Sequence, residues 1–559
     1  MAISPWRFCC VILLTFIIIS SGSCRPKRRT DDAKKIVSRM SLEQKIGQLV
    51  MVGVPGTRLT DDTKRIISRY RPGGIILFGF NIENREQTRS FIGDMQKYSM
   101  EINGMPMLVS IDQEGGRVFR IRDGVTQFPG NLALGAADDR SLTYRVARVL
   151  GMQLRKMGVN MNLAPVLDVN NNPLNPVINT RSFGSNPLEV AMLGISYILG
   201  LQESFCIAVG KHFPGHGDTS DDSHLTLPVI PYDMDRLNKV ELFPFARAVK
   251  SGVESVMTAH ISYPKIINGN TPATLSKYFL SDILRKKMKF PGIIITDDME
   301  MHAISRNYGI GKAAVMSIKA GTDIVLVSSN GKSIGEIVST IKSSVATGEL
   351  SVNRIDESVA RIIETKLRYH IMDVKENKIV AAEPQYSAAD LKILQSADSI
   401  NREVSRKSIY AHNLNRQNLM EMTSRKTIQI VVTENRVIAA VCGNLSNDNC
   451  IVTGTGGMYA AIAAARKKLA PGGKLALFYH VNSPAISHIK NAEAAADKYN
   501  ASVCLLSTGN PFPLSQLKSI PPVIYSFSNT EESLKQVAEC ITGKFIPKFS
   551  IKFSLGSPE

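Results

Sequence analysis

The sequence has 559 residues, of which 44% are hydrophobic, with 40 Gly and 26 Pro, values that exclude a disordered or fibrous chain. A chain of this length exceeds one ordinary core, so we expect two folded domains. Lys and Arg outnumber Asp and Glu by 67 to 49, a net charge of +18. Because no recognition motif accompanies this scattered charge, we expect attraction to anionic wall polymers or lipid headgroups and no nucleic-acid partner.

Residues 1–24 predict a secretory signal. Arg7 precedes an apolar run, Phe8–Ile19, and the small residues Ser20–Ser23 then lead to Cys24. The run is too short to span a membrane comfortably. The cysteine after small residues resembles a bacterial lipoprotein signal with Cys24 as the acylated first residue. Because Ser21 stands where leucine is usual, ordinary signal cleavage is the alternative. We expect an exported protein, periplasmic or on the cell surface and anchored to a membrane by lipid.

Between residues 31 and 372 a short apolar run, a polar turn and an amphipathic helix recur. Apolar runs alternating with helices predict a parallel sheet buried on both faces. Eight such units predict an α/β fold of the (β/α)8 TIM-barrel type, with an open doubly wound sheet as the competing arrangement. The predicted strands are Ile46–Gly53, Gly74–Gly79, Met107–Asp112, Met161–Val169, Cys206–Phe213, Val253–His260, Gly292–Asp298 and Asp323–Ser328. The predicted helices include Asn84–Glu101, Asp139–Gly158, Asn186–Ser204, Asp235–Gly252 and Leu275–Phe290.

The rest of the chain predicts a linker and a second domain. Residues 373–405 lose the strand–helix alternation, which indicates a linker with some helix. Residues 406–559 predict a smaller α/β sandwich domain. Its predicted strands are Ile428–Val432, Val437–Val441, Leu475–Tyr479, Val503–Leu506 and Val523–Phe527, and its predicted helices are Ala460–Leu469, Ala492–Tyr499 and Glu532–Ile541. The five cysteines beyond Cys24 are widely spaced and match neither a disulfide framework nor a metal-binding motif.

Polar residues follow five of the predicted barrel strands. They are Asp112–Arg120, Asn179–Gly184, Lys211–His224, His260 and Thr296–Glu300. In a parallel barrel all of these strand ends open at one mouth. Each group alone could be a salt bridge or a helix cap, whereas together they predict one functional site.

The residue types at this mouth indicate particular chemistry. Asp297 ends the run Ile293–Ile295, so a buried strand holds its carboxylate, which could attack an electrophilic carbon or stabilise a cation. Asp222 and His224 lie two apart in a loop, where the carboxylate could orient the ring. An imidazole with a pKa of about 6.5 suits proton transfer at neutral pH. Fixed hydrogen bonds to a sugar ring could come from Asp112, Arg120, Arg181, Lys211 and His212.

The motifs Asp112–Arg120, Arg181–Gly184, Lys211–His224 and Ile295–Asp297 together resemble family 3 of the glycoside hydrolases. The Lys-His-Phe-Pro-Gly-His-Gly sequence, followed by Asp-Ser-His, resembles the β-N-acetylglucosaminidase branch of that family. The resemblance covers about residues 40 to 370 and is weaker in the second domain. It implies a retaining exo-enzyme that removes terminal β-linked N-acetylglucosamine, with peptidoglycan fragments as the expected carbohydrate partner and no metal or cofactor.

The resemblance also implies residue roles. Asp297 would be the nucleophile, and His224 with Asp222 would replace the usual second carboxylate as acid and base. The sugar would be bound by Asp112, Arg120, Arg181, Lys211 and His212.

Several alternatives stay open. The same site could serve a glycoside phosphorylase or a β-glucosidase of the family, and a non-catalytic lipoprotein that binds wall sugar is an alternative of another class. Asp298 and Glu300 are rival acids for which structural pairing is the simpler role. We expect His216 to support the loop and His260 to line the site without an assigned role.

Overall fold

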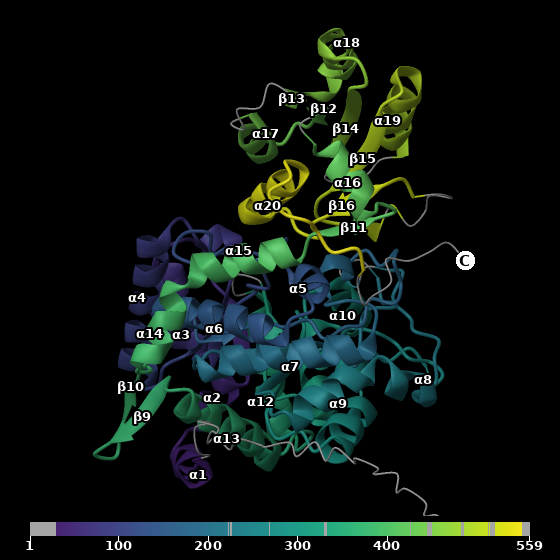
Figure 1. Cartoon of the computed structure of the whole chain (residues 1–559). Coiled ribbons are helices and arrows are strands. Elements are labelled where there is room, and N and C mark those ends of the chain that lie inside the picture. The colour runs from purple at the N-terminus through teal and green to yellow at the C-terminus, as the bar shows by residue number, and fades with distance from the viewer. Residues whose placement is uncertain are drawn as a thin grey trace, which may run out of the picture.

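The computed structural model describes residues 29–221, 223, 226–267, 269–328, 332–424, 426–443, 450–481, 486–512, 514 and 520–550. Within these residues an eight-stranded sheet and a six-stranded sheet occupy separate parts of the chain (Figure 1). The predicted signal and Cys24 lie outside the described residues. Over the part of the chain that is described, no helix is both long enough and apolar enough for a membrane span.

The larger sheet is a nearly closed parallel barrel. Its order is β7-β6-β5-β4-β3-β2-β1-β8, with every pair parallel. A bridge between Ile295 and Ile324 joins the two outer strands, and the Thr296 N–H donates to the Ile324 carbonyl at 3.0 Å. The predicted (β/α)8 barrel is therefore confirmed. The strands are β1 Val50–Gly53, β2 Gly74–Leu77, β3 Leu108–Ile111, β4 Met161–Asn162, β5 Ile207–Phe213, β6 Ser255–Thr258, β7 Ile293–Ile295 and β8 Val325–Val327.

Helices surround the barrel and cover its outer face (Figure 1). A segment of π-helix, Tyr278–Lys287, lies between β6 and β7. The α-helices are α1 Thr30–Ser38, α2 Leu42–Gln48, α3 Asp61–Tyr70, α4 Arg85–Asn103, α5 Asn131–Ala137, α6 Arg140–Lys156, α7 Pro187–Glu203, α8 Met234–Lys239, α9 Leu242–Lys250, α10 His302–Tyr308, α11 Ile310–Ala320, α12 Lys332–Ala346 and α13 Val352–Arg368.

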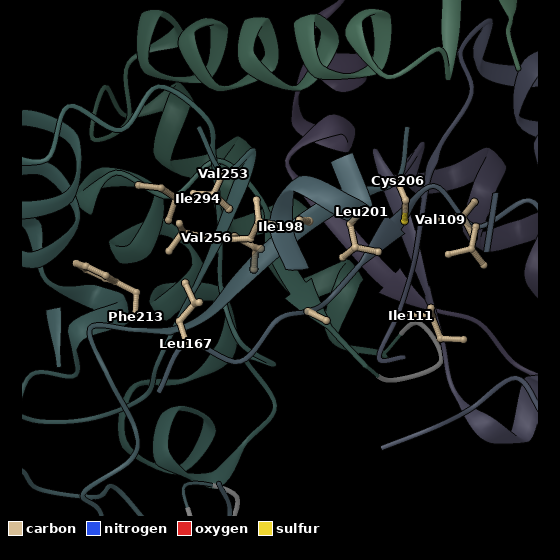
Figure 2. Packing of buried hydrophobic residues seen from close by; sticks show 14 of the residues in the cluster. Val109, Ile111, Leu167, Ile198, Leu201, Cys206, Phe213, Val253, Val256 and Ile294 are labelled. Atoms are coloured by element: carbon tan, nitrogen blue, oxygen red, sulfur yellow. The ribbon is translucent and has the colours of Figure 1, made fainter. Parts of the chain in front are cut away.

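Two layers of apolar side chains hold the barrel strands. Alternate strand residues point to opposite faces, so each strand supplies both layers. Outside the sheet, Ile198 and Leu201 of α7 lie among strand residues that include Val109, Val256 and Ile294 (Figure 2). Full burial of such a side chain contributes roughly 1.5–3 kcal/mol, so both layers fix the strand ends firmly. The inner layer includes Met51, Ile76, Leu108, Met161, Ile207, Val209, Met257, Ile293, Ile295 and Leu326.

A hairpin and two helices follow the barrel. The hairpin is β9 Met372–Lys375 with β10 Lys378–Ala381, and the helices are α14 Ala388–Gln395 and α15 Ala397–Lys407. Charged pairs fasten α15 to the barrel, since Arg145 pairs with Glu403 at 2.9 Å and Lys407 pairs with Asp139 at 2.8 Å. The predicted linker segment thus packs on α6 along the barrel surface.

The second sheet forms an α/β sandwich. Its order is β11-β16-β15-β14-β12-β13, parallel except for β11 against β16. Separate apolar clusters cover its two faces, as expected for a three-layer sandwich. The strands are β11 Tyr410–His412, β12 Thr427–Val432, β13 Cys450–Thr453, β14 Lys474–Val481, β15 Ser502–Ser507 and β16 Val523–Tyr525. The helices are α16 Arg416–Met422, α17 Arg436–Gly443, α18 Met458–Lys468, α19 Ile486–Tyr499 and α20 Glu531–Ile541.

Some predicted elements were wrong. The run Val437–Val441 lies in α17, because the Asn435 side chain caps a helix whose buried residues Ile438 and Cys442 are four apart. The first strand begins later than predicted because a capping box at Ser41 starts α2.

Two other predicted elements are interrupted by proline. The fourth strand has only two residues, and Pro165 cannot donate to the ladder beyond it. The helix predicted at residues 235–252 is two helices, α8 and α9, and Pro244 lies in the first turn of the second.

Candidate active site

A cavity of about 360 Å³ opens at the carboxyl ends of the barrel strands. Its lining brings together six of the predicted site residues: Asp112, Arg120, Arg181, Lys211, His212 and Asp297. Asp112 and Arg120 follow β3, Arg181 lies in the region after β4, Lys211 and His212 lie at the end of β5, and Asp297 follows β7. Four parts of the barrel thus contribute to one site. The predicted acid/base pair, Asp222 and His224, lies outside the described residues. Ser223, the residue between them, lines the cavity.

A buried charge cluster forms the wall of the cavity after β3, β4 and β5. The Lys211 Nζ lies 2.6 Å from Asp112 Oδ1 and 2.7 Å from Glu114 Oε1. Arg181 donates two hydrogen bonds to Glu114, from Nε at 3.0 Å and from Nη2 at 2.8 Å. This planar fork fixes both side chains, so the cluster has a defined geometry before any ligand enters.

The cluster also fixes its own charge states. Burial alone raises the pKa of Glu114, but Arg181 and Lys211 outweigh it and hold that pKa far below its usual value. Burial lowers the pKa of Lys211, and the carboxylates of Asp112 and Glu114 outweigh that effect, so the pKa is raised. Glu114 and Lys211 are therefore both charged at neutral pH and form a fixed polar surface for hydroxyl groups.

Arg120 differs from its neighbours in this wall. Within the described part of the chain, its Nε atom is buried without a hydrogen-bond partner. A buried donor of this kind costs about 1–3 kcal/mol if it stays unpaired. Because Arg120 also lines the cavity, a ligand oxygen could accept this hydrogen bond.

His212 is held by Asp168, a residue that the sequence-based prediction missed. The His212 Nδ1 lies 2.7 Å from Asp168 Oδ2, and the backbone N–H groups of His212 and His216 also donate to this carboxylate. Burial raises the pKa of Asp168, but His212 and the other hydrogen bonds outweigh it and lower that pKa. An ionised Asp168 orients His212 so that its Nε2 faces away from the pair, as in other carboxylate–histidine pairs.

Asp297 lies on the other side of the cavity, directly after β7. Its Oδ1 accepts the Asp298 N–H at 2.8 Å. Burial raises the pKa of Asp297, but His212, His260 and this hydrogen bond outweigh it and hold the pKa below its usual value. Asp297 is thus ionised at neutral pH, the state that a nucleophile or an electrostatic stabiliser needs.

Asp298 and Glu300 connect the β7 loop to the end of β8. The Asp298 Oδ1 accepts N–H groups from Glu300 and Ser328, both at 3.1 Å. Glu300 accepts the Ser328 hydroxyl at 3.1 Å and the Ser333 hydroxyl. Burial, with Glu300 and Asp297 nearby, raises the pKa of Asp298 to about 6 despite the hydrogen bonds from Ser328 and Glu300. These contacts fit the structural role for Asp298 and Glu300, which is simpler than the role of catalytic acid.

Two further histidines near the cavity, His216 and His260, form hydrogen bonds with neighbouring residues. The His216 ring lies 2.9 Å from the hydroxyls of Thr219 and Ser223, and burial, with His212 close by, lowers its pKa to about 4. His216 therefore supports the loop that carries Ser223. His260 contacts the Thr274 hydroxyl at 2.8 Å and the Asp298 carbonyl at 3.0 Å. Among the described residues, no group of three or more His, Cys, Asp or Glu side chains could hold a metal ion.

Comparison with known proteins identifies the family of the chain. The N-terminal domain of glycosyl hydrolase family 3 matches residues 41–365. A β-hexosaminidase A from Pseudoalteromonas piscicida is 35% identical over 334 residues, which are 56% of either protein. A β-hexosaminidase from Nitrosomonas eutropha is 35% identical over 320 residues, 56% of this chain and 90% of the relative.

A solved structure is similar over nearly the whole chain. It is a family 3 β-N-acetylglucosaminidase from Paenibacillus sp. str. FPU-7, with 32% identity and a TM-score of 0.77. The match covers 93% of this chain and 99% of that structure, so both domains share the arrangement. With the motifs, the barrel and the family match in agreement, the chain belongs to glycosyl hydrolase family 3 and is a glycoside hydrolase.

Proposed function

We propose that the protein is a retaining exo-β-N-acetylglucosaminidase that uses Asp297 as its nucleophile. The observation that carries this proposal is the cavity itself, with an ionised, rigid Asp297 on one side and a fixed hydrogen-bonding cluster on the other. β-Hexosaminidases among the relatives, and a β-N-acetylglucosaminidase with the same two domains, support the choice of sugar.

The cluster around Lys211 orients the terminal sugar. Asp112, Lys211, Arg181 and His212 offer acceptors and donors to ring hydroxyls, and Arg120 supplies a further donor. Because these groups follow β3 to β5 and Asp297 follows β7, the hydroxyl-bearing side of the ring faces the cluster and C1 faces Asp297. Binding of this kind places the reacting atoms close together before the chemistry begins.

Two displacement steps complete the reaction. In the first, an Asp297 oxygen attacks C1 while His224 donates a proton to the glycosidic oxygen, which leaves as an alcohol. In the second, His224 removes a proton from water, whose oxygen attacks C1 and releases the Asp297 carboxylate. Two inversions at C1 leave the product with the β-configuration of the substrate. In this proposal Asp222 is the dyad partner of His224, because a carboxylate beside an imidazole stabilises the protonated ring.

Cell-wall fragments are the proposed natural substrate. Export with a lipid on Cys24 would put the enzyme outside the cytoplasm, where peptidoglycan fragments with terminal N-acetylglucosamine occur. The net charge of +18 suits association with anionic wall polymers and lipid headgroups. Mass analysis of the protein from its native membrane tests the anchor, because acylated Cys24 predicts a lipid-bearing N-terminal peptide. An unmodified chain beginning at another residue would contradict it.

A direct assay tests the activity. The purified chain should release p-nitrophenol from the β-N-acetylglucosaminide and, much more slowly, from the β-glucoside. The glucosidase alternative predicts the reverse order, and a non-catalytic sugar-binding protein releases nothing from either substrate. Muropeptides with a terminal N-acetylglucosamine, analysed by mass spectrometry, then test the proposed natural substrate.

A phosphorylase is the second candidate, because a histidine acid/base repels phosphate less than a carboxylate would. Turnover measured with and without inorganic phosphate separates the two reactions. Water as acceptor yields free N-acetylglucosamine at a rate that phosphate leaves unchanged. Acceleration by phosphate, with the sugar 1-phosphate as product, would favour the phosphorylase.

A further inference from the structure

Helix α5 belongs to the apolar cores of both domains. Leu132, Ala133 and Ala136 pack in the cluster that covers one face of the six-stranded sheet, although they precede that sheet by nearly 300 residues. In Figure 1, α5 lies at the side of the barrel that faces the second domain. The second domain therefore rests on a helix of the barrel.

The other face of α5 holds the segment that carries Arg181. The Asn131 Nδ2 donates a hydrogen bond to the Arg181 carbonyl at 2.7 Å. One turn later, Gly135 lies against Phe183, so closely that a Cβ atom there would be 1.9 Å from the Phe183 carbonyl oxygen. Residues four apart share one face of a helix, so this face of α5 fixes both ends of Arg181–Phe183.

The second domain also holds the end of α5 through Lys548. The backbone of Lys548 pairs with β11, with the Ala411 N–H donating to its carbonyl at 2.8 Å. Its Nζ crosses to the barrel and donates to the carbonyls of Ala136 and Ala137 at 2.9 and 2.7 Å. A lysine at this position satisfies the last carbonyls of a helix and complements its dipole.

The interface reaches the active-site cluster itself. A second cavity, of about 190 Å³, lies between the domains and includes Glu114 and Arg181 in its lining. The second domain contributes Gly509, Asn510, Phe527, Ser528 and Asn529 to that lining. The salt bridge between Glu114 and Arg181 thus borders both the active-site cavity and the domain interface.

We propose that the second domain sets sugar affinity by holding Arg181 in place through α5, with Lys548 and Asn131 as positioning residues. Lys548 fixes the C-terminal end of α5. The apolar face of α5 fixes the orientation of the helix against the six-stranded sheet. The hydrogen bond from Asn131 to the Arg181 carbonyl then makes the position of Arg181 depend on that of α5. Arg181 in turn orients Glu114, which binds Lys211. The kinetic part of this inference rests on the proposed function, whereas the structural part does not.

Four variants test the inference. Lys548→Met removes the two hydrogen bonds to α5, and Asn131→Ala removes the one to Arg181. Lys548→Arg keeps donors at the same place and is the conservative rescue. Lys544→Met is the matched control, because Lys544 is exposed and pairs with Glu539 within the second domain. Each variant is compared only after its circular dichroism and elution volume match those of the wild type, which removes misfolded material.

Hydrogen–deuterium exchange measures the position of the segment without any substrate. Lys548→Met and Asn131→Ala should both speed exchange across residues 179–184, and Lys544→Met and Lys548→Arg should leave it unchanged. Unchanged exchange in both test variants would overturn the inference, whatever sugar the enzyme cleaves.

Kinetics measures the consequence for the sugar. On the p-nitrophenyl β-N-acetylglucosaminide, KM should rise about tenfold in Lys548→Met and Asn131→Ala with kcat within about twofold, because binding geometry is disturbed more than the chemistry. Lys548→Arg should restore the wild-type KM. A stability loss with an unchanged KM would show that the contact is only structural. A wild type inactive on this substrate would contradict the proposed function, and exchange would still decide the inference.

Discussion

The two sides of the active-site cavity hold their charges in different ways. On the side of β3 to β5, every side chain that we assign to binding, apart from Arg120, contacts a charged side chain at 2.6–3.0 Å. On the side after β7, the carboxylates of Asp297 and Asp298 accept hydrogen bonds from backbone N–H groups of the described residues. The side chains on the first side thus pair directly with one another, whereas Asp297 is held by a backbone hydrogen bond and is stabilised from a greater distance by His212 and His260.

This difference separates binding from reaction. A neutralised, rigid cluster can hydrogen-bond a neutral sugar without a large change in charge, so it defines where the ring lies. The ionised Asp297 on the other side favours the positive charge that develops at C1 in the transition state. The pKa values of Asp297 and Asp298 are shifted in opposite directions, which keeps one carboxylate ionised and makes its neighbour the readily protonated one.

Removal of the nucleophile should give the largest effect. Asp297→Ala should lower kcat/KM for the aryl glycoside by at least about 10³-fold, because no other carboxylate reaches C1 in the same way. Asp298→Asn, its matched control, should retain measurable turnover, since its contacts are structural. Near-normal turnover in Asp297→Ala, or inactivity in Asp298→Asn alone, would reverse the assignment of the two neighbours.

Loss of the proposed acid/base should depend on the leaving group. His224→Ala should lower kcat/KM by about 10²–10⁴-fold on a disaccharide, because the departing alcohol needs a proton. On an aryl glycoside with a highly acidic phenol, glycosylation should be nearly spared. Steady-state rates on a series of aglycones measure how kcat/KM depends on the acidity of the leaving group. An equal loss on every aglycone would show that His224 does not protonate the leaving group.

Removal of the Glu114 carboxylate should weaken sugar binding and lower the stability of the fold. Glu114→Gln leaves Lys211 and Arg181 with less compensation in a buried place, which should cost about 3 kcal/mol of unfolding free energy and raise KM. Urea denaturation and initial rates measure the two effects. Asp282→Asn, in an exposed pair with Lys286, is the control and should cost about 0.5 kcal/mol or less.

A smaller effect should appear in the pH dependence of stability. Asp298 has a pKa of about 6 in the fold against an ordinary value of 3.8, so the folded state binds more protons than the unfolded state between those pH values. The contribution of Asp298 to stability should therefore fall as pH rises through this window, by about 2 kcal/mol. The buried His216, whose pKa is lowered, contributes in the opposite direction, so the Asp298 contribution is the difference between the wild type and Asp298→Asn. Urea midpoints between pH 4 and 7 measure it. Equal pH dependence in wild type and variant would contradict the raised pKa of Asp298.

Much of the fold was predictable because the barrel strands are short, buried and regularly spaced. Local ambiguity caused the errors. Val437–Val441 is apolar and β-branched, and such a run fits a short strand as well as one face of a helix. The three residues of β11 and the four of β13 are too few for a periodic signal. Pro165 and Pro244 were the available signals for the interrupted elements.

The sequence motifs predicted the main site residues but not the side chains that pair with them. Asp297 and Arg181 follow barrel strands and Lys211 lies near the end of β5, so they were found. Glu114 lies inside the same motif as Asp112, and Asp168 ends an apolar run, and both became visible only when long-range pairs were seen. An acidic residue that interrupts an apolar strand end was the one signal for Asp168. No sequence pattern indicated that α5 belongs to two cores.

The most direct test of the account is to trap the sugar on the enzyme. A fluorinated N-acetylglucosaminyl donor that forms the intermediate quickly and hydrolyses slowly should label wild-type protein with one sugar. Digestion and mass spectrometry should place that label on Asp297. A label on Asp298 or another residue, or hydrolysis with inversion and no label, would contradict the assignment of the two sides of the cavity.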